Sequence, residues 1–150
     1  MHSFVSCLLH VVFSTKERRR VIMPSLQEQL WPYLGGIARN NKVKAVKIGG
    51  VEDHVHILLS LPATLDIAKA VQLLKGSSSK WVHETFPDQQ TFEWQAGYGA
   101  FSIGIGISGE ADTVAYIESQ AEHHKRITFQ DELASILRKH GIEFETAMLD

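Results

Sequence analysis

Two groups of polar side chains in this sequence have the residue types and the spacing that catalysis requires. The first is the pair His54 and His56, two residues apart in a β-rich run. Alternate residues of a strand point to the same face, so a strand here would place both imidazoles side by side. Neutral imidazole nitrogens are common ligands of divalent metals. Two unrelated strand histidines would have the same spacing, so the pair alone does not establish a metal site.

The second group is a polar stripe formed by Tyr116, Gln120 and His123, whose spacing fits one side of a helix. A tyrosine hydroxyl can attack phosphorus if a metal ion lowers its pKa or neutralises the phosphate, and Gln120 offers a carbonyl oxygen as a ligand. The alternative is a tyrosine that only anchors a surface helix. The neighbouring side carries apolar residues suited to packing, namely Val114, Ile117 and Ala121.

The hydrophobic pattern predicts the elements that would position these side chains. Alternating apolar residues indicate strands, and apolar residues at helical spacing indicate helices. The expected strands cover residues 3–13, 43–48, 54–61 and 101–107, and the expected helices cover 24–39, 66–82, 110–126 and 130–140. This order predicts an α+β fold, a ferredoxin-like βαββαβ antiparallel sheet with additional C-terminal helices. The first two helices would cover one face and leave the other open, with His10, His54 and His56 on the open face.

Composition predicts one cytoplasmic domain spanning residues 1–150. At 44% hydrophobic and 21% charged residues, the chain can bury a core of ordinary size. The only cysteine is Cys7, so no disulfide can form within the chain. The apolar stretch 4–13 is too short to span a bilayer, and its basic residues follow it, unlike those of a signal peptide. We therefore expect no membrane contact.

The charge is unevenly distributed despite a net value of only −2. Residues 1–51 carry a net charge of +6 and the remainder carries −8. Such asymmetry suits a basic surface that meets phosphates, although a solvated charged face would look the same. The candidates for contacts with a nucleic-acid backbone follow the first strand and are Lys16, Arg18, Arg19 and Arg20.

Three segments together resemble one family, the HUH single-tyrosine transposases of bacterial and archaeal insertion sequences. They are HVH at 54–56, GYGAFS at 97–102 and YIESQAEHH at 116–124. The likeness extends from VFSTK at 12–16 to HGIE at 140–143. Two departures stand out: Ser119 replaces a common asparagine, and GIGI at 104–107 would lengthen the strand before the tyrosine helix.

The resemblance implies a DNA strand transferase. Tyr116 would attack a DNA phosphodiester, forming a 5′-phosphotyrosine and releasing a 3′-hydroxyl, without an organic cofactor. His54, His56 and Gln120 would hold Mg²⁺ or Mn²⁺, and two imidazoles would also tolerate zinc. The resemblance further implies a homodimer that binds single-stranded DNA hairpins at element ends. It favours a Tyr116 that serves the partner subunit, although a short connection before its helix would also let it reach its own histidines.

Two other functions fit parts of the sequence. A noncatalytic RNA-binding module would use the open face of a ferredoxin-like sheet, and GYGAF at 97–101 resembles an aromatic RNA-recognition motif. That motif normally begins with a basic residue, and it would leave His54, His56 and the Tyr116 stripe unused. A metal nuclease that activates water would use the same histidines without forming a covalent adduct. The run KGSSSK at 75–80 lacks the spacing of a phosphate-binding loop.

Overall fold

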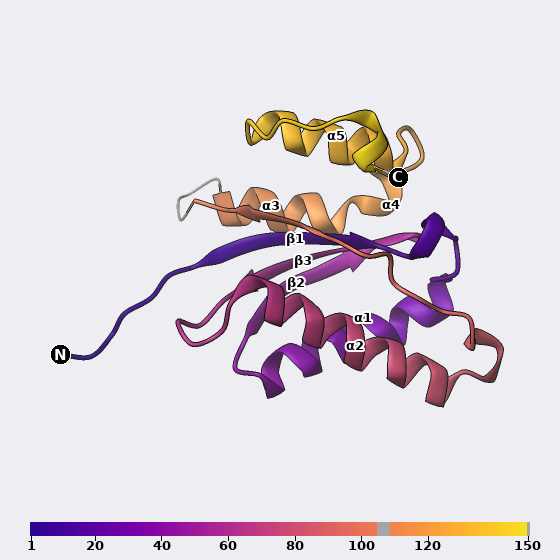
Figure 1. Cartoon of the computed structure of the whole chain (residues 1–150), viewed down its shortest axis with the longest axis horizontal. Coiled ribbons are helices and arrows are strands. Elements are labelled where there is room, and N and C mark those ends of the chain that lie inside the picture. The colour runs from indigo at the N-terminus through magenta and orange to yellow at the C-terminus, as the bar shows by residue number, and fades with distance from the viewer. Residues whose placement is uncertain (105–108, 150) are drawn as a thin grey trace.

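The computed structural model describes residues 1–104 and 109–149, which form three layers (Figure 1). The strands are β1 (Leu8–Ser14), β2 (Lys44–Gly50), β3 (His54–Ser60) and β4 (Gly99–Ser102). The α-helices are α1 (Pro24–Asn40), α2 (Ile67–Thr85), α3 (Gly109–Glu118), α4 (Gln120–His123) and α5 (Phe129–Lys139), and the 3₁₀ turns are η1 (Lys16–Arg18), η2 (Pro87–Gln89) and η3 (Thr146–Leu149). In the described part, no helix is long and apolar enough to cross a membrane.

The sheet confirms the predicted ferredoxin-like arrangement. Its strand order is β2-β3-β1-β4, and every neighbouring pair is antiparallel. In the register of β1 and β3, Val12 lies opposite His56 and His10 lies opposite Leu58. Because residues two apart share a face, His10 and His56 become diagonal neighbours across the two central strands.

One face of the sheet holds the main hydrophobic core. α1 and α2 lie against this face (Figure 1), and each contributes a stripe of buried residues at helical spacing. Asp66 caps α2 by accepting a hydrogen bond from the Lys69 backbone N–H, as the sequence suggested. The core residues include Leu30, Leu34, Val55, Ile57, Leu59, Val71 and Leu74. The KGSSSK run lies within α2, where Ser78 is fully buried.

The expectation of an open second face is wrong, because α3, α4 and α5 cover it (Figure 1). All residues of β1 after Leu8 are buried, so this strand has a covered surface on both sides. The cause lies in α5, which carries an apolar stripe that must be removed from water. Phe129 of that stripe packs with Val12 and Phe101 of the sheet, next to Leu133, Ile136 and Leu137.

Three element boundaries also differ from the expected ones. β1 begins at Leu8, and residues 1–7 form no strand. β4 ends at Ser102, and the expected extension over 105–107 lies outside the described residues. The single helix expected over 110–126 breaks at Ser119, whose hydroxyl donates to the Tyr116 carbonyl. Such side-chain bonds compete with the helical ladder, so α3 ends there and α4 starts anew.

Candidate active site

Two histidines of β3 form the floor of the candidate site, and neither is exposed to solvent. Nδ1 of His54 lies 2.7 Å from Asp53 Oδ1, so a carboxylate at the start of the strand orients that ring. Nδ1 of His56 lies 2.8 Å from Nε2 of His10. Both rings therefore direct Nε2 away from the strand, toward the layer of C-terminal helices.

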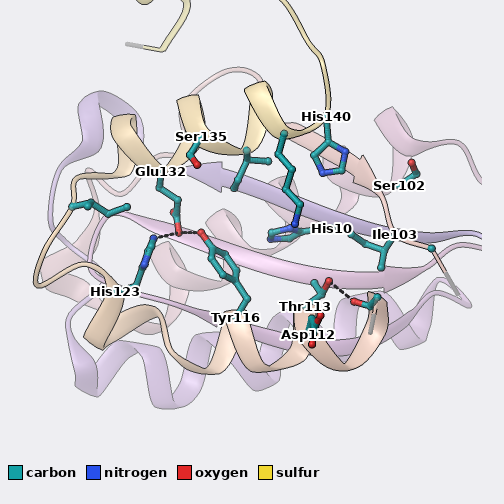
Figure 2. Close-up of a pocket in the computed structure, with 15 residues that line it drawn as sticks. His10, Ser102, Ile103, Asp112, Thr113, Tyr116, His123, Glu132, Ser135 and His140 are labelled. Atoms are coloured by element: carbon teal, nitrogen blue, oxygen red, sulfur yellow. Dashed lines mark hydrogen bonds and ion pairs between the residues drawn. The ribbon is translucent and has the colours of Figure 1, made fainter. Parts of the chain in front are cut away.

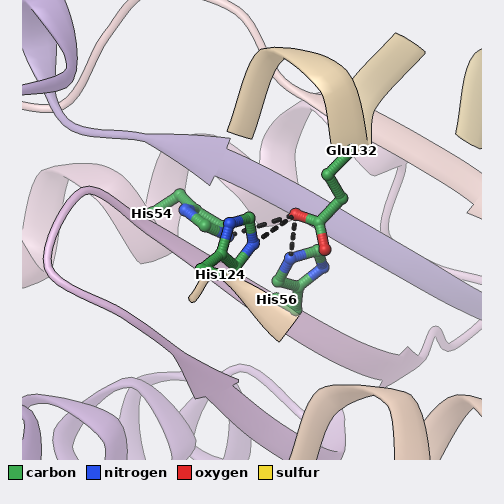
Figure 3. Close-up of side chains that lie close together, drawn as sticks. All are labelled: His54, His56, His124 and Glu132. Carbon is green, nitrogen blue, oxygen red and sulfur yellow. Dashed lines mark hydrogen bonds and ion pairs between the residues drawn. The ribbon is translucent and has the colours of Figure 1, made fainter. Parts of the chain in front are cut away.

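A carboxylate from α5 lies where these nitrogens converge (Figure 3). Glu132 Oε1 is 3.2 Å from Nε2 of His54 and 3.0 Å from Nε2 of His56. Nε2 of His124, just after α4, is also 3.0 Å from this oxygen. The ligand atoms of these four side chains all lie within 4.8 Å of one another. Three imidazoles and one carboxylate thus form a compact group able to hold a metal ion.

Gln120 lies beside this group, at the position that the sequence suggested. The break at Ser119 turns its side chain inward, and Gln120 is only 1% exposed. Its Oε1 is 3.2 Å from Nε2 of His54, and its Nε2 donates to the Tyr116 carbonyl at 3.3 Å. The amide therefore links the last turn of α3 to the histidine pair.

Tyr116 projects from α3 into the same region. Its hydroxyl donates a hydrogen bond to Glu132 Oε2, and the two side chains point toward each other in Figure 2. The ring centroids of Tyr116 and His56 are 5.7 Å apart. These residues stand beside a pocket of about 580 Å³ between β4, α3 and α5. Its polar lining includes His10, Tyr116, His123, Glu132, Lys139 and His140.

The electrostatics of the group follow from burial and from the close contacts. Burial alone would raise the pKa of Glu132, but hydrogen bonds from His124, His54 and His56 hold it far below its usual value. Burial and the contact with Glu132 raise the pKa of Tyr116, so its hydroxyl stays protonated at neutral pH. Burial and the nearby His56 lower the pKa of His10 to about 3, which leaves that ring neutral.

Sequence reasoning did not single out Glu132, and it gave His124 no chemical role. A signal for Glu132 is nevertheless present, because it lies three residues after Phe129 and four before Ile136 on the apolar stripe of α5. A carboxylate in such a stripe needs a buried partner. His123 points toward the same carboxylate, with Nε2 3.3 Å from Glu132 Oε2, but this nitrogen has no hydrogen-bond partner among the described residues.

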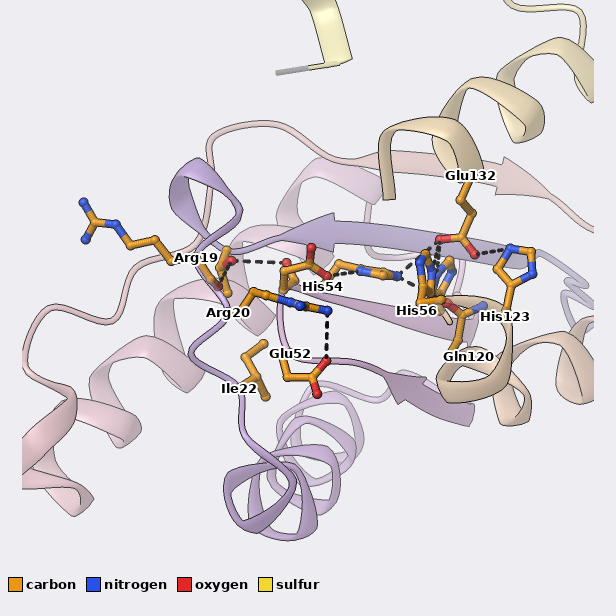
Figure 4. A network of polar contacts seen from close by, with 12 residues as sticks. Arg19, Arg20, Ile22, Glu52, His54, His56, Gln120, His123 and Glu132 are labelled. Atoms are coloured by element: carbon orange, nitrogen blue, oxygen red, sulfur yellow. Dashed lines mark hydrogen bonds and ion pairs between the residues drawn. The ribbon is translucent and has the colours of Figure 1, made fainter. Parts of the chain in front are cut away.

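The basic segment after β1 lies at one edge of the site, and three of its cations have acidic partners. The ion pairs are Lys16–Glu93 at 3.2 Å, Arg19–Glu17 at 3.0 Å and Arg20–Glu52 at 4.0 Å. Figure 4 shows Arg20 directed toward Glu52 and Arg19 pointing away from the histidines. These pairs are largely exposed, so each one holds its cation only weakly.

Arg18 differs from its neighbours in its backbone and in its surroundings. Glu17 and Arg18 both have positive φ values, 57° and 53°, which non-glycine residues rarely adopt. The guanidinium carbon lies 5.7 Å from the centroid of Phe129, which in turn stacks on His54. Arg18 Nε is buried without a hydrogen-bond partner among the described residues. The segment therefore places the guanidinium of Arg18 against the site. Arg18 also lines a groove together with Arg20, His124, Lys125 and Arg126.

Comparison of this chain with known proteins identifies its family. A family model described as Transposase IS200 like matches residues 3–120. The chain belongs to this family of transposases. It is 26% identical over 129 residues to the transposase for insertion sequence element IS200 of Salmonella typhimurium, which covers 83% of each chain. It is 27% identical over 114 residues to the ISDra2 transposase TnpA of Deinococcus radiodurans, covering 74% of this chain and 81% of that protein.

Solved transposase structures have the same fold. A Deinococcus radiodurans protein assigned as a transposase superposes with a TM-score of 0.64 at 26% identity, over 80% of this chain and 95% of that one. A REP-associated tyrosine transposase bound to a REP hairpin superposes with a TM-score of 0.61, over 85% of this chain and 74% of that one. At 15% identity, the second likeness concerns the fold alone.

Family membership and the covered sheet both count against a noncatalytic RNA-binding module. Such a module would bind RNA on an open sheet face, and here α3, α4 and α5 lie over that face. The match to the transposase family ends at Gln120. That match therefore does not include His124 or Glu132.

Proposed function

We propose that this transposase cleaves and rejoins single-stranded DNA by transesterification, with Tyr116 as the nucleophile. The observation that carries this assignment is the position of Tyr116, which lines a pocket and directs its hydroxyl to Glu132, next to the buried histidine group. A bond would form between the Tyr116 oxygen and phosphorus, and the bond from phosphorus to the 3′-oxygen would break. The Tyr116 oxygen would lose its proton as it bonds to phosphorus, and the leaving 3′-oxygen would take up a proton.

The proposed cofactor is a divalent cation, Mg²⁺ or Mn²⁺, held by His54, His56 and Gln120. The donor set fits, because Asp53 fixes the ring of His54 and the Gln120 oxygen lies within 3.2 Å of that ring's Nε2. When bound, a cation would supply Lewis-acid polarisation of the scissile phosphate. Burial and Glu132 raise the pKa of Tyr116, so a nearby positive charge would favour attack by its oxygen.

The proposed DNA partner is a hairpin at the end of an insertion sequence. The basic segment and the adjoining groove offer Lys16, Arg18, Arg19 and Arg20 for backbone contacts, which would fix the strand's position without reading its sequence. A transposase with the same fold was solved bound to a REP hairpin, which supports a folded single strand as ligand. We also propose a homodimer, and the DNA substrate would place the protein in the cytoplasm.

Denaturing electrophoresis with a labelled single-stranded hairpin tests this function. The wild-type chain should form a covalent protein–DNA adduct in the presence of Mg²⁺ or Mn²⁺. Tyr116→Phe should abolish the adduct and the cleavage while leaving hairpin binding nearly intact, because it removes only the attacking oxygen. Tyr33→Phe is the matched control, because Tyr33 lies on α1 at the other face of the sheet. Cleavage without an adduct would instead identify a metal nuclease that activates water.

A further inference from the structure

We propose that His124 and Glu132 join His54 and His56 in a four-residue site that selects a transition-metal ion of the Zn²⁺ or Co²⁺ class over Mg²⁺. This inference rests on the proposed function in one respect, since it concerns the ion of the same site. The ligands differ from those of the proposed function, because two of the four, His124 and Glu132, lie beyond the segment that the family model matches. The preferred metal also differs from Mg²⁺.

A contact with the backbone orients the ring of His124. Nδ1 of His124 is 3.0 Å from the carbonyl oxygen of Ile127, which can only accept a hydrogen bond. Nδ1 therefore donates to this carbonyl, which leaves Nε2 as the nitrogen that can bind a metal ion. That Nε2 lies 3.0 Å from Glu132 Oε1.

The same reasoning applies to His54. Its Nδ1 lies 2.7 Å from the carboxylate of Asp53 and donates there, so Nε2 is the nitrogen available to bind a metal ion. This Nε2 also faces Glu132 Oε1, at 3.2 Å. A bound metal ion would replace the imidazole protons that hydrogen-bond to Glu132.

The third imidazole is oriented in the same way. Nδ1 of His56 lies 2.8 Å from Nε2 of His10, so its own Nε2 is the nitrogen that faces the site. That Nε2 is 3.0 Å from Glu132 Oε1. His10 is thus placed to orient His56, as Asp53 orients His54 and the Ile127 carbonyl orients His124.

The chemistry of the donor set decides which ion is preferred. Three imidazole nitrogens and one carboxylate are typical of zinc and related transition metals, whereas Mg²⁺ prefers oxygen ligands and retains several waters. Burial strengthens this preference, because His54 and His56 are inaccessible to solvent and Glu132 is 1% exposed. Asp53, whose side chain is 19% exposed, adds a second negative charge beside His54 that would favour a divalent cation.

A cobalt titration of the metal-stripped full-length chain tests the proposal, with visible absorption as the readout. We expect one Co²⁺ per chain with the spectrum of a low-coordinate nitrogen-rich site, displacement by Zn²⁺, and no displacement by Mg²⁺ at similar concentration. Glu132→Gln and His124→Gln should each weaken Co²⁺ affinity by about 10- to 100-fold. Glu28→Gln and His2→Asn, which alter exposed residues away from the site, should leave it unchanged.

Hydrogen exchange provides a second readout that does not depend on the variants. Because Glu132 lies on α5, Zn²⁺ should slow amide exchange across residues 129–139 in the wild-type chain. Thermal melting checks that both substituted chains remain folded.

The proposal is overturned if Co²⁺ does not bind, or if both variants bind it as the wild type does. In the second case, the two β3 histidines and Gln120 alone would hold the ion, and the proposed function would be untouched. Conversely, if the wild-type chain binds Co²⁺ but forms no covalent adduct with DNA, the role of Tyr116 as the nucleophile is refuted and this metal site is unaffected.

Discussion

At the scale of single residues, Arg18 stands apart from the other basic residues of its segment. It is held by a backbone in the left-handed region, and its Nε is buried without a hydrogen-bond partner among the described residues. Strained backbone persists where surrounding structure enforces it, often at binding sites. The contact between Arg18 and Phe129, and between Phe129 and His54, places this cation next to the histidine group. A phosphate in the groove would lie near Arg18 as well as Arg20, Lys125 and Arg126.

We therefore predict that Arg18→Ala weakens binding of single-stranded DNA and reduces the slope of log affinity against log salt by about one unit. The physical reason is that one phosphate contact, with its released counterion, is lost. Fluorescence anisotropy at several salt concentrations measures both quantities. Arg39→Ala is the control, because Arg39 is exposed on α1 at the other face of the sheet. An unchanged slope for Arg18→Ala would place the phosphate contacts elsewhere.

At the scale of elements, the contact between α3 and β2 decides where Tyr116 lies. Ile117 is 1% exposed, and it packs where Gly49 of β2 leaves space. A Cβ at residue 49 would be 2.8 Å from the Ile117 carbonyl oxygen, which is closer than real Cβ contacts allow. The ion pair between Lys47 and Glu118, at 3.1 Å, ties the same two elements together. A shift of α3 relative to β2 would therefore move Tyr116, the residue before Ile117, relative to β3.

Gly49→Ala should consequently reduce DNA cleavage on the order of 100-fold, because small misplacements of a reacting group are costly. The affinity of the basic segment for DNA should change little. Single-turnover cleavage and anisotropy measure the two effects separately. Gly36→Ala is the matched control, since a Cβ there meets nothing within 4 Å, and within helix α1 it should raise stability by about 0.5–1 kcal/mol. Wild-type cleavage by Gly49→Ala would show that this contact does not position Tyr116.

At the scale of the whole molecule, one chain brings together all the groups that the proposed reaction uses. The histidines of β3 meet Glu132 of α5 between the sheet and the C-terminal layer (Figure 4), and Tyr116 of α3 points toward the same carboxylate (Figure 2). The family resemblance favours a tyrosine that serves the partner subunit. The contacts within one chain instead favour a Tyr116 that acts with its own His54 and His56.

Mixing Tyr116→Phe chains with His56→Ala chains distinguishes the two arrangements. If each chain is self-contained, both sites of a heterodimer remain defective, and we expect no recovery of cleavage. The measurement is adduct formation after subunit exchange, with heterodimers verified by two different affinity tags. Recovered activity would show that α3 and its tyrosine reach the histidines of the other subunit.

The sequence by itself determined the strand and helix order, and with it the ferredoxin-like sheet. Local periodicity was sufficient there, because alternation and helical spacing depend only on near neighbours in the chain. The same local pattern put His54 and His56 on one face, and it put Tyr116 and Gln120 on one stripe. It also suggested that His10 would be their neighbour, because the strand order of this fold places β1 beside β3.

Only the tertiary structure decided what covers those residues. The apolar stripe of α5 has to be buried somewhere, but periodicity does not say against which surface. Its docking on the second sheet face closes the face that was expected to be open, and it carries Glu132 to the histidines of β3. Glu132 lies 76 residues from His56 in the chain. Their contact arises from long-range packing driven by hydrophobic burial, and the local pattern around Glu132 does not specify its partner.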